Sequence, residues 1–493
     1  MREPLRSTEI EAPAAGAMGT ASIAPDQPPP VETRPPALPP HSRFGVLRHR
    51  HFRNVWAGAM VSNIGGWMEG VGVQWIVAHK TGSPLMMATL AAAQMGPMLV
   101  LGLVGGIAAD RINRKRLLLA TQLIMMLIAA ALMTCSAFDA ATPGVLLALS
   151  LLQGITLAFN YPAWQVLTPR LVPRDELAAA IALNGLQFNL ARVVGPALAG
   201  ALMTAKTPTW LFACNTVSFL FVLFAVTGTP DAPAPPRDRR SMLHQTLDAL
   251  SFVFHRRGPR AVFLATVTFA LLAAPLMRML PLFAKDVYND HDPLLGVIRA
   301  LPFSGMDEPR AMVFSWLLTV MGAGAVAGVL LLSWVPRWYP KHHFIPLSVM
   351  TGGLLIAAFS ATRSLTLASV ILFLAGIFWL WAFNSSMAAL QLLVPDQMRG
   401  RVMSVNNIAV FGAMPVGAFL AGLIGKAASS HLSPGASTQV GVGTLGAVLC
   451  IAGLAMLIWR TPEVDGIKPG EPGYDRVPSL LRGFTAAAHR PRS

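Results

Sequence analysis

Long apolar runs separated by short polar segments make up most of the sequence. A helix needs about 20 apolar residues to cross the hydrocarbon core of a membrane, and twelve runs come close to or exceed that length. They are 55–78, 85–109, 117–137, 145–167, 177–204, 210–227, 261–284, 312–335, 344–361, 365–392, 402–427 and 440–459. The pattern predicts an all-α membrane protein with twelve transmembrane helices in two pseudo-symmetric six-helix bundles.

Polar segments divide this pattern into five parts. Residues 1–50 are rich in proline and are expected to form a disordered cytoplasmic arm. Residues 51–228 are predicted to form the N-terminal six-helix bundle, and 229–259 a basic cytoplasmic linker. Residues 260–460 are then the C-terminal six-helix bundle, and 461–493 a cytoplasmic tail.

Lysine and arginine in the short loops orient the predicted helices. Loops with an excess of positive charge stay on the cytoplasmic side. The even-numbered loops carry Arg111, Arg114, Lys115 and Arg116, then Arg170 and Arg174, the basic residues of 237–260, Arg337 and Lys341, and finally Arg399 and Arg401. The odd-numbered loops carry few, which places both termini in the cytoplasm. The seventh loop, 285–310, is long and mixed in charge; it either covers a cavity mouth or is a tolerated insertion.

Composition and charge exclude several classes of protein. Of the 493 residues, 54% are hydrophobic and only 12% charged, whereas soluble domains carry about a quarter charged residues. The net charge of +15 lies between apolar runs, so it indicates a lipid bilayer and not nucleic acid as the partner. The three cysteines lack metal spacing, and no Walker A motif, metal cluster or paired nucleophile and base occurs. We therefore expect no cofactor, no metal and no enzymatic activity.

The two halves of the sequence resemble each other. Leu171, Val172 and Pro173 align with Leu393, Val394 and Pro395 at an offset of about 222 residues. At the same offset, Asn184, Gly195, Ala199 and Gly200 align with Asn406, Gly417, Ala421 and Gly422. Parallel repeats of this kind place a substrate site at their interface, near the middle of the membrane.

A loop motif identifies a family. The stretch from Gly106 through Asp110, Arg111, Arg114 and Lys115 resembles the loop between helices two and three of the major facilitator superfamily. Asn113 stands where that loop usually has a turn glycine, and asparagine tolerates the left-handed conformation. In a two-fold related bundle Asp110 would meet the start of the eleventh helix near Arg399 and Arg401, where the helix dipole stabilises a carboxylate. We predict that this contact is a gate that closes the cytoplasmic side.

Other motifs are similar to one branch of this superfamily, the enterobactin exporters and transmembrane secretion effectors. They are Phe159 to Gln165, Leu171 to Leu177, Phe188 to Gly200 and Val394 to Ser404. The resemblance covers roughly residues 52 to 460, and Trp164 stands where the branch often has arginine. Gly195 and Pro196 resemble the antiporter signature, in which proline bends the helix. The resemblance implies an exporter of small molecules, typically driven by proton influx. We expect it to act as a monomer in a bacterial inner membrane.

Three ionisable residues interrupt the predicted spans, and such residues are functional candidates by default. Glu69, Arg192 and Arg278 lie at similar depth, roughly 21 to 26 Å from the cytoplasmic starts of their helices at about 1.5 Å per residue. One carboxylate and two guanidiniums allow either a permanent pair of Glu69 with Arg192 or an exchange of partners. Burial favours a neutral carboxyl and a nearby arginine favours a charged one, so an exchange would load and release a proton.

Aromatic and amide side chains within the spans are candidates for lining a substrate cavity. They are Trp67, Gln74, Asn160, Trp164, Gln187, Asn189, Trp381 and Asn384. The preferred function is secondary active transport, a proton-coupled export of a siderophore, drug-like or other small amphipathic molecule by alternating access. Two alternatives stay open: a carrier of the lysophospholipid flippase type, and a membrane scaffold that transports nothing.

Overall fold

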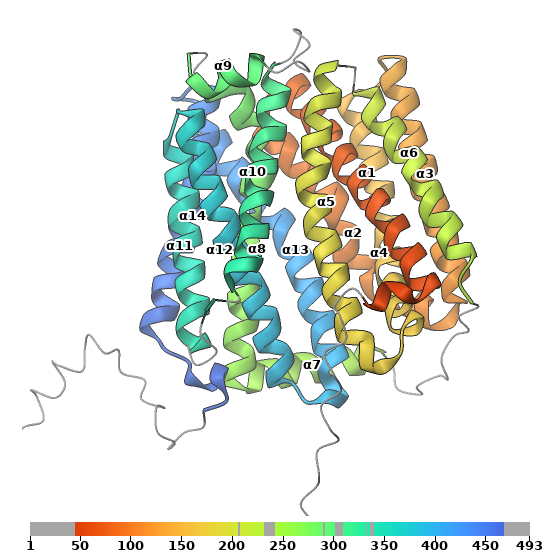
Figure 1. Cartoon of the computed structure of the whole chain (residues 1–493). Coiled ribbons are helices and arrows are strands. Elements are labelled where there is room, and N and C mark those ends of the chain that lie inside the picture. The colour runs from red at the N-terminus through yellow and green to blue at the C-terminus, as the bar shows by residue number, and fades with distance from the viewer. Residues whose placement is uncertain are drawn as a thin grey trace, which may run out of the picture. The chain divides into compact units, whose positions relative to one another are not determined.

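The computed structural model describes residues 45–205, 208–230, 242–288, 291–300, 309–332, 334–335 and 340–467, and these contain helices and no β-strand. The long helices are α1 (Arg50–Thr81), α2 (Pro84–Arg111), α3 (Arg114–Ala137), α4 (Pro143–Leu171), α5 (Leu177–Ala205), α6 (Thr209–Thr227), α8 (Arg257–Asp286), α10 (Pro309–Leu332), α11 (Lys341–Ala361), α12 (Leu365–Leu393), α13 (Asp396–Ala428) and α14 (Pro434–Ile458). Two shorter helices, α7 (Met242–His255) and α9 (Pro293–Ala300), lie at opposite ends of the bundle (Figure 1). We call these the α7 end and the α9 end.

Eleven helices in the described part of the chain are long and apolar enough to cross a membrane. The prediction of an all-α membrane protein is confirmed. The expected first span, 55–78, falls inside α1, which has 32 residues but is less apolar than the others. Polar Asn63, Glu69 and Gln74 interrupt its run, so its membrane crossing stays a prediction. The terminal arm and tail lie almost wholly outside the described residues.

Apolar side chains cover the outside of the helices, and polar side chains are buried between them. Phe224 is 82% exposed and Val100 is 72% exposed, whereas Asn215 and Asn406 are fully buried. Lipid favours this inversion of the soluble pattern, because apolar surface meets hydrocarbon while polar groups find partners inside the protein.

The helices pack in two groups with the same internal pairing. In the first helix group, α1–α6, α1 packs against α5 and α6, α2 against α4, and α3 against α6. In the second helix group, α8 and α10–α14, α8 packs against α13 and α14, α10 against α12, and α11 against α14. Each pair in one group has a counterpart in the other, in agreement with the repeat in the sequence. Across the boundary, α2 packs against α13 and α5 against α10.

Repeated glycines occupy equivalent places in this packing. Gly195 lies against Trp67 of α1, and Gly417 lies against Leu271 of α8, so closely that a Cβ at either position would overlap its neighbour. Small residues allow such close approach of helices in membranes. Pro275 follows Leu271 by four residues and has no N–H for the Leu271 carbonyl. Gly417 therefore lets α13 pack directly on a carbonyl that lacks its usual helical donor.

Gly200 and Gly422 form the equivalent pair across the boundary between the groups. A Cβ at Gly200 would lie 2.8 Å from Ser315 Cβ of α10, and one at Gly422 would lie 3.1 Å from the Pro84 carbonyl oxygen of α2. Real Cβ atoms essentially never approach to the first distance and rarely to the second. Glycine at both positions lets the groups touch.

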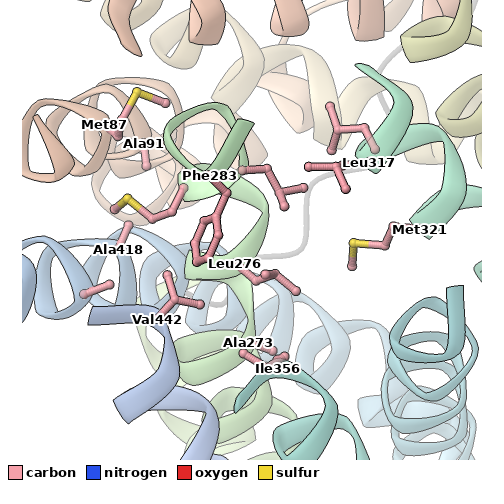
Figure 2. Close-up of a cluster of buried hydrophobic side chains, with 14 of the residues drawn as sticks. Met87, Ala91, Ala273, Leu276, Phe283, Leu317, Met321, Ile356, Ala418 and Val442 are labelled. Carbon is pink, nitrogen blue, oxygen red and sulfur yellow. The ribbon is translucent and has the colours of Figure 1, made fainter. Parts of the chain in front are cut away.

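A buried apolar cluster extends from the second helix group into the first. Figure 2 shows Phe283 and Leu276 of α8 among side chains of several helices, with Met87 and Ala91 of α2 beside them. Phe283, Leu276 and Met87 are fully buried. The cluster excludes water from this part of the boundary.

The contacts that join the groups near the α9 end include both apolar and polar ones. The rings of Trp75 and Phe314 stack with centroids 6.4 Å apart. Lys285 donates to the carbonyl oxygen of His79 at 3.0 Å, where a cation also stabilises the C-terminal end of α1. The helix groups thus contact each other directly at the end of the bundle that carries α9.

An aspartate fixes α9 to the second helix group. Asp292 caps α9 through the Leu294 N–H at 3.0 Å and also accepts from the Leu365 N–H at 2.7 Å and the Ser364 hydroxyl at 2.9 Å, at the start of α12. Burial alone would raise the pKa of Asp292, but hydrogen bonds from Ser364, Thr366 and two backbone N–H groups outweigh it and hold the pKa below its ordinary value. The described part of the seventh loop is therefore anchored to the second group.

We expect Asp292→Ala to destabilise the protein by about 1–3 kcal/mol, because several hydrogen bonds to a charged group are lost. The stabilisation from this carboxylate is complete above its ordinary pKa of about 3.9 and is lost as the pH falls through the lower folded value. Thermal unfolding at pH 7 and pH 3.5 measures both effects. Asp248→Ala, on an exposed position of α7, is the control, and an equal loss there would contradict the anchor.

Candidate functional site

Glu69 lies in a buried polar cluster inside the first helix group. Its side chain is 2% exposed. One carboxyl oxygen accepts from Gln153 Nε2 of α4 at 2.7 Å, and the other accepts from Asn215 Nδ2 of α6 at 2.6 Å. Among the described residues, no cation contacts this carboxyl group. A buried carboxylate without a cation is costly even when hydrogen-bonded, and taking up a proton removes that cost.

Of the two amide side chains that hold Glu69, Asn215 is fixed more firmly than Gln153. The Ser218 hydroxyl shares its one proton between the Asn215 carbonyl oxygen at 2.7 Å and Asn215 Oδ1 at 3.1 Å, and the second contact favours the orientation in which the Asn215 amide nitrogen faces Glu69. Gly65 makes room for both, since a Cβ there would lie 2.5 Å from Ser218 Oγ and 2.6 Å from Asn215 Oδ1. Within the described part of the chain, Gln153 has no contact besides Glu69 that fixes its amide. A turned Gln153 would present its oxygen to a protonated Glu69.

The two arginines lie at the boundary between the helix groups. Arg192 on α5 is 9% exposed; its Nη2 lies 3.5 Å from Met277 Sδ of α8, and its guanidinium lies 5.7 Å from the Trp379 ring centroid of α12. Arg278 on α8 donates to Gln94 Oε1 of α2 at 2.7 Å. Each guanidinium thus belongs to one group and contacts the other.

The permanent pair of Glu69 with Arg192 is wrong. Both carboxyl oxygens of Glu69 face α4 and α6, while Arg192 faces α8 and α12 in the second group. Depth in the membrane was inferred from residue counts, but the direction of each side chain depends on how its helix is rotated. Exchange of partners in another conformation and the three proton-coupling roles stay predictions.

The loop between α2 and α3 differs from the expectation at Asn113. Its φ is −56°, so it is not left-handed; instead its side chain caps α3 by accepting from the N–H groups of Lys115 and Arg116. Asparagine is favoured at this position because its oxygen satisfies free helix donors. Lys115 Nζ donates to the carbonyl oxygens of Thr227 at 2.8 Å and Thr229 at 2.6 Å, which fixes the end of α6.

The contact of Asp110 with the start of the eleventh predicted helix stays a prediction. The side chains of Asp110 and Arg111 lie outside the described residues, and Gly106 lies within α2. Arg114 is 7% exposed, and Arg399 Nε donates to the Gln391 carbonyl oxygen at 3.0 Å. The antiporter signature falls inside α5, where Pro196 lies within the continuous helix next to Gly195. A role of these residues in gating or bending stays a prediction.

Several cavity candidates have partners within their own helix group. Asn160 donates to Thr121 Oγ1 at 2.8 Å, Gln187 to the Trp56 carbonyl oxygen at 3.1 Å, and Trp381 to the Gly328 carbonyl oxygen at 2.8 Å. The rings of Trp67 and Phe188 meet edge to face with centroids 6.4 Å apart. The remaining candidates are Gln74 and Asn189, bonded to their own helices, partly buried Trp164, and exposed Asn384. Contact with a substrate stays a prediction for all eight.

The sequence alone did not predict the partners of Glu69, Arg192 and Arg278. Gln153, Asn215 and Gln94 each interrupt an apolar run, which is a usable signal for a buried polar contact. Met277 carries no such signal, because methionine is an ordinary core residue.

The arrangement of the two helix groups indicates the class of protein. Two similarly packed helix groups meet along a boundary that buries charged side chains, as in membrane transporters built from parallel repeats. The profile of one family, described as transmembrane secretion effectors of the major facilitator type, matches residues 41–470. The chain belongs to this family, and its relatives are transporters.

The relatives include exporters of siderophores and drugs. The staphyloferrin A transporter of Staphylococcus aureus is 23% identical, over 72% of this chain and 85% of its own. The multidrug efflux pump Tap of Mycolicibacterium fortuitum is 22% identical, over 76% and 88%. The enterobactin exporter of Salmonella choleraesuis is 25% identical, over 83% and 92%.

Solved structures confirm the fold alone. The nucleoside transporter NupG, as its D323A mutant, superposes with a TM-score of 0.61 at 13% identity, covering 83% of this chain and 99% of its own. A D-xylose–proton symporter gives 0.61 at 13% identity, covering 86% and 100%. The fold is that of secondary transporters.

Proposed function

We propose that this protein is a proton-coupled exporter of a small amphipathic molecule, siderophore-like or drug-like, in a bacterial inner membrane. The observation that carries the proposal is Glu69, a buried carboxyl group that is held by two amides and contacts no cation of the described residues. A group in that position changes its charge by binding a proton, and its charge affects the packing of α1, α4 and α6. The named activities of the relatives, export of siderophores and drugs, support the direction and the substrate class.

In this proposal the chain crosses the membrane twelve times, with α1 as the additional crossing. We infer from the basic loops that the α7 end and both termini lie in the cytoplasm and that the α9 end lies outside. Rocking of the two helix groups about the boundary would open the site alternately to each side. One chain supplies both groups, so the transporter works as a monomer with bundles at 51–228 and 260–460.

The test has two stages. Comparison of small molecules in the medium of cells with and without the protein identifies the cargo. Accumulation of that cargo is then measured in everted vesicles, with and without an acid interior. Accumulation that depends on the pH gradient is expected. A folded protein that accumulates nothing would favour a scaffold, and accumulation that ignores the gradient would exclude proton coupling.

A further inference from the structure

Arg192 and Arg278 have no carboxylate partner in the described part of the chain. Within those residues, the only hydrogen-bond acceptor of Arg192 is the Met277 sulfur, at 3.5 Å. Arg278 has the Gln94 amide oxygen and the Met95 sulfur, the latter at 3.5 Å. A guanidinium has five N–H donors, and sulfur is a weak acceptor. Most donors of both guanidiniums therefore have no partner among the described residues.

Their environment is apolar and aromatic. Arg192 lies over the Trp379 ring, and that ring meets Phe269 edge to face with centroids 5.1 Å apart. A cation over an aromatic face gains a modest stabilisation. This is less than the cost of burying an arginine without an anion.

The arrangement is reciprocal across the boundary. Arg192 belongs to the first group and contacts Met277 of the second, and the next residue, Arg278, reaches back to α2 of the first. Two positive charges thus lie along the boundary, where parallel repeats place their substrate. Glu69 does not neutralise them, because its oxygens are bonded to Gln153 and Asn215.

We infer that this boundary binds an oxyanion, a carboxylate or phosphate on an otherwise aromatic or apolar molecule, through the Arg192 guanidinium stacked on Trp379. The planar fork of arginine fits both anions with two parallel hydrogen bonds. Arg278 contributes a second positive charge and joins the anion site to α2. The inference rests on the proposed transport function and specifies the chemistry of its substrate.

The experiment measures binding to the purified full-length protein without a pH gradient. The probes are dansylglycine, its neutral amide, and a dansyl aminoethyl phosphate, and energy transfer from tryptophan to the dansyl group reports binding. Both anionic probes are expected to bind at least tenfold more tightly than the amide. A preference for only one would identify the anion as carboxylate or phosphate.

Arg192→Gln should weaken binding of the anionic probe about ten- to hundredfold, the loss typical of a hydrogen bond to a charged group. Binding of the amide should not change. Arg192→Lys should restore only part of the affinity, because lysine lacks the fork. Trp379→Phe should reduce the energy transfer while the probe still binds. That result would place the bound probe beside Trp379 and therefore beside Arg192. Arg256→Gln is the matched control, since that exposed guanidinium also lies over a ring, 4.5 Å from Phe252.

Equal affinity of the wild-type protein for the acid and the amide would overturn the inference. So would an Arg192→Gln variant that keeps the preference for the anion. If Arg192→Gln does not fold, Arg278→Gln and stabilisation of the wild-type protein by the anionic probe decide the question. Failure of proton coupling would appear only in the vesicle assay, so the two proposals fail separately.

Discussion

Glu69→Gln is expected to reduce pH-driven accumulation in everted vesicles at least tenfold, to the level seen without a gradient. Glutamine keeps the size and one acceptor oxygen of the side chain but cannot bind and release a proton at neutral pH. Export coupled to protons therefore stops. Exchange of cargo across the membrane without a gradient should continue, because it needs no net proton step.

The same substitution should leave the protein folded. Asn215, fixed by Ser218, can still donate to the glutamine oxygen. The new amide nitrogen meets Gln153, which can turn to present its own oxygen. No arginine is left without a partner, since neither Arg192 nor Arg278 is paired with Glu69. We expect the free energy of unfolding to stay within about 1 kcal/mol of wild type or to rise, because a buried charge is removed.

Glu463→Gln provides the matched control. Glu463 lies in a short 3-10 helix (Pro462–Asp465) that follows α14, with its carboxyl oxygen 4.0 Å from the Arg257 guanidinium, in a partly exposed position. The control should transport normally, and both variants should be compared by accumulation and by thermal unfolding. Full pH-driven accumulation in Glu69→Gln would eliminate Glu69 as the proton carrier. A variant that does not fold would instead assign Glu69 a structural role.

The fold was largely predictable from the sequence because the membrane imposes helices of a fixed length. Apolar runs marked the helices, and the glycines at 195 and 417, and at 200 and 422, marked equivalent positions in the two helix groups. The hydropathy of α1 is weak because polar residues interrupt its apolar run. One of these residues is Glu69, the candidate proton carrier.

The candidate site was predictable in composition but not in connectivity. The sequence identified three buried charges and their depth, because charged residues stand out in apolar runs. It could not give their partners. Residues at equal depth on two helices meet only if both helices turn the right faces toward each other, and Glu69 and Arg192 face different neighbours.

Asn113 shows a second limit of prediction from the sequence. The family resemblance placed a turn there, and asparagine can adopt either a left-handed turn or a helix N-cap. The N-cap is the conformation found, because its side chain satisfies two free N–H groups of α3. A motif indicates where the chain turns, whereas the hydrogen bonds available decide how.

The two prominent pairings between the groups bear on how the transporter moves. Contacts along α2 with α13 and along α5 with α10 begin at the α9 end, at Gly422 and Gly200. At these two positions glycines make the contact, and such contacts separate without breaking strong bonds. A side chain inserted there should separate the groups at the α9 end.

Gly200→Val is expected to shift the protein toward a conformation open at the α9 end and to reduce transport at least tenfold. Even a Cβ would lie 2.8 Å from Ser315 Cβ, and Ser315 is almost fully buried and has no long flexible side chain to move aside. The groups must separate to relieve this overlap. The reporter is Ala78→Cys in a protein whose three natural cysteines are replaced. Ala78 is fully buried beside Lys285, where the two helix groups meet at the α9 end.

Alkylation of that cysteine should be slow in the parent and at least tenfold faster with Gly200→Val. Gly422→Val, the equivalent change on α13, should act in the same direction. Gly185→Val on the same helix is the control, because a Cβ there meets nothing within 4 Å. Equal labelling in Gly200→Val and Gly185→Val would show that the groups do not separate at this contact. Loss of folding in Gly200→Val alone would mean that the contact fixes the structure and does not open during transport.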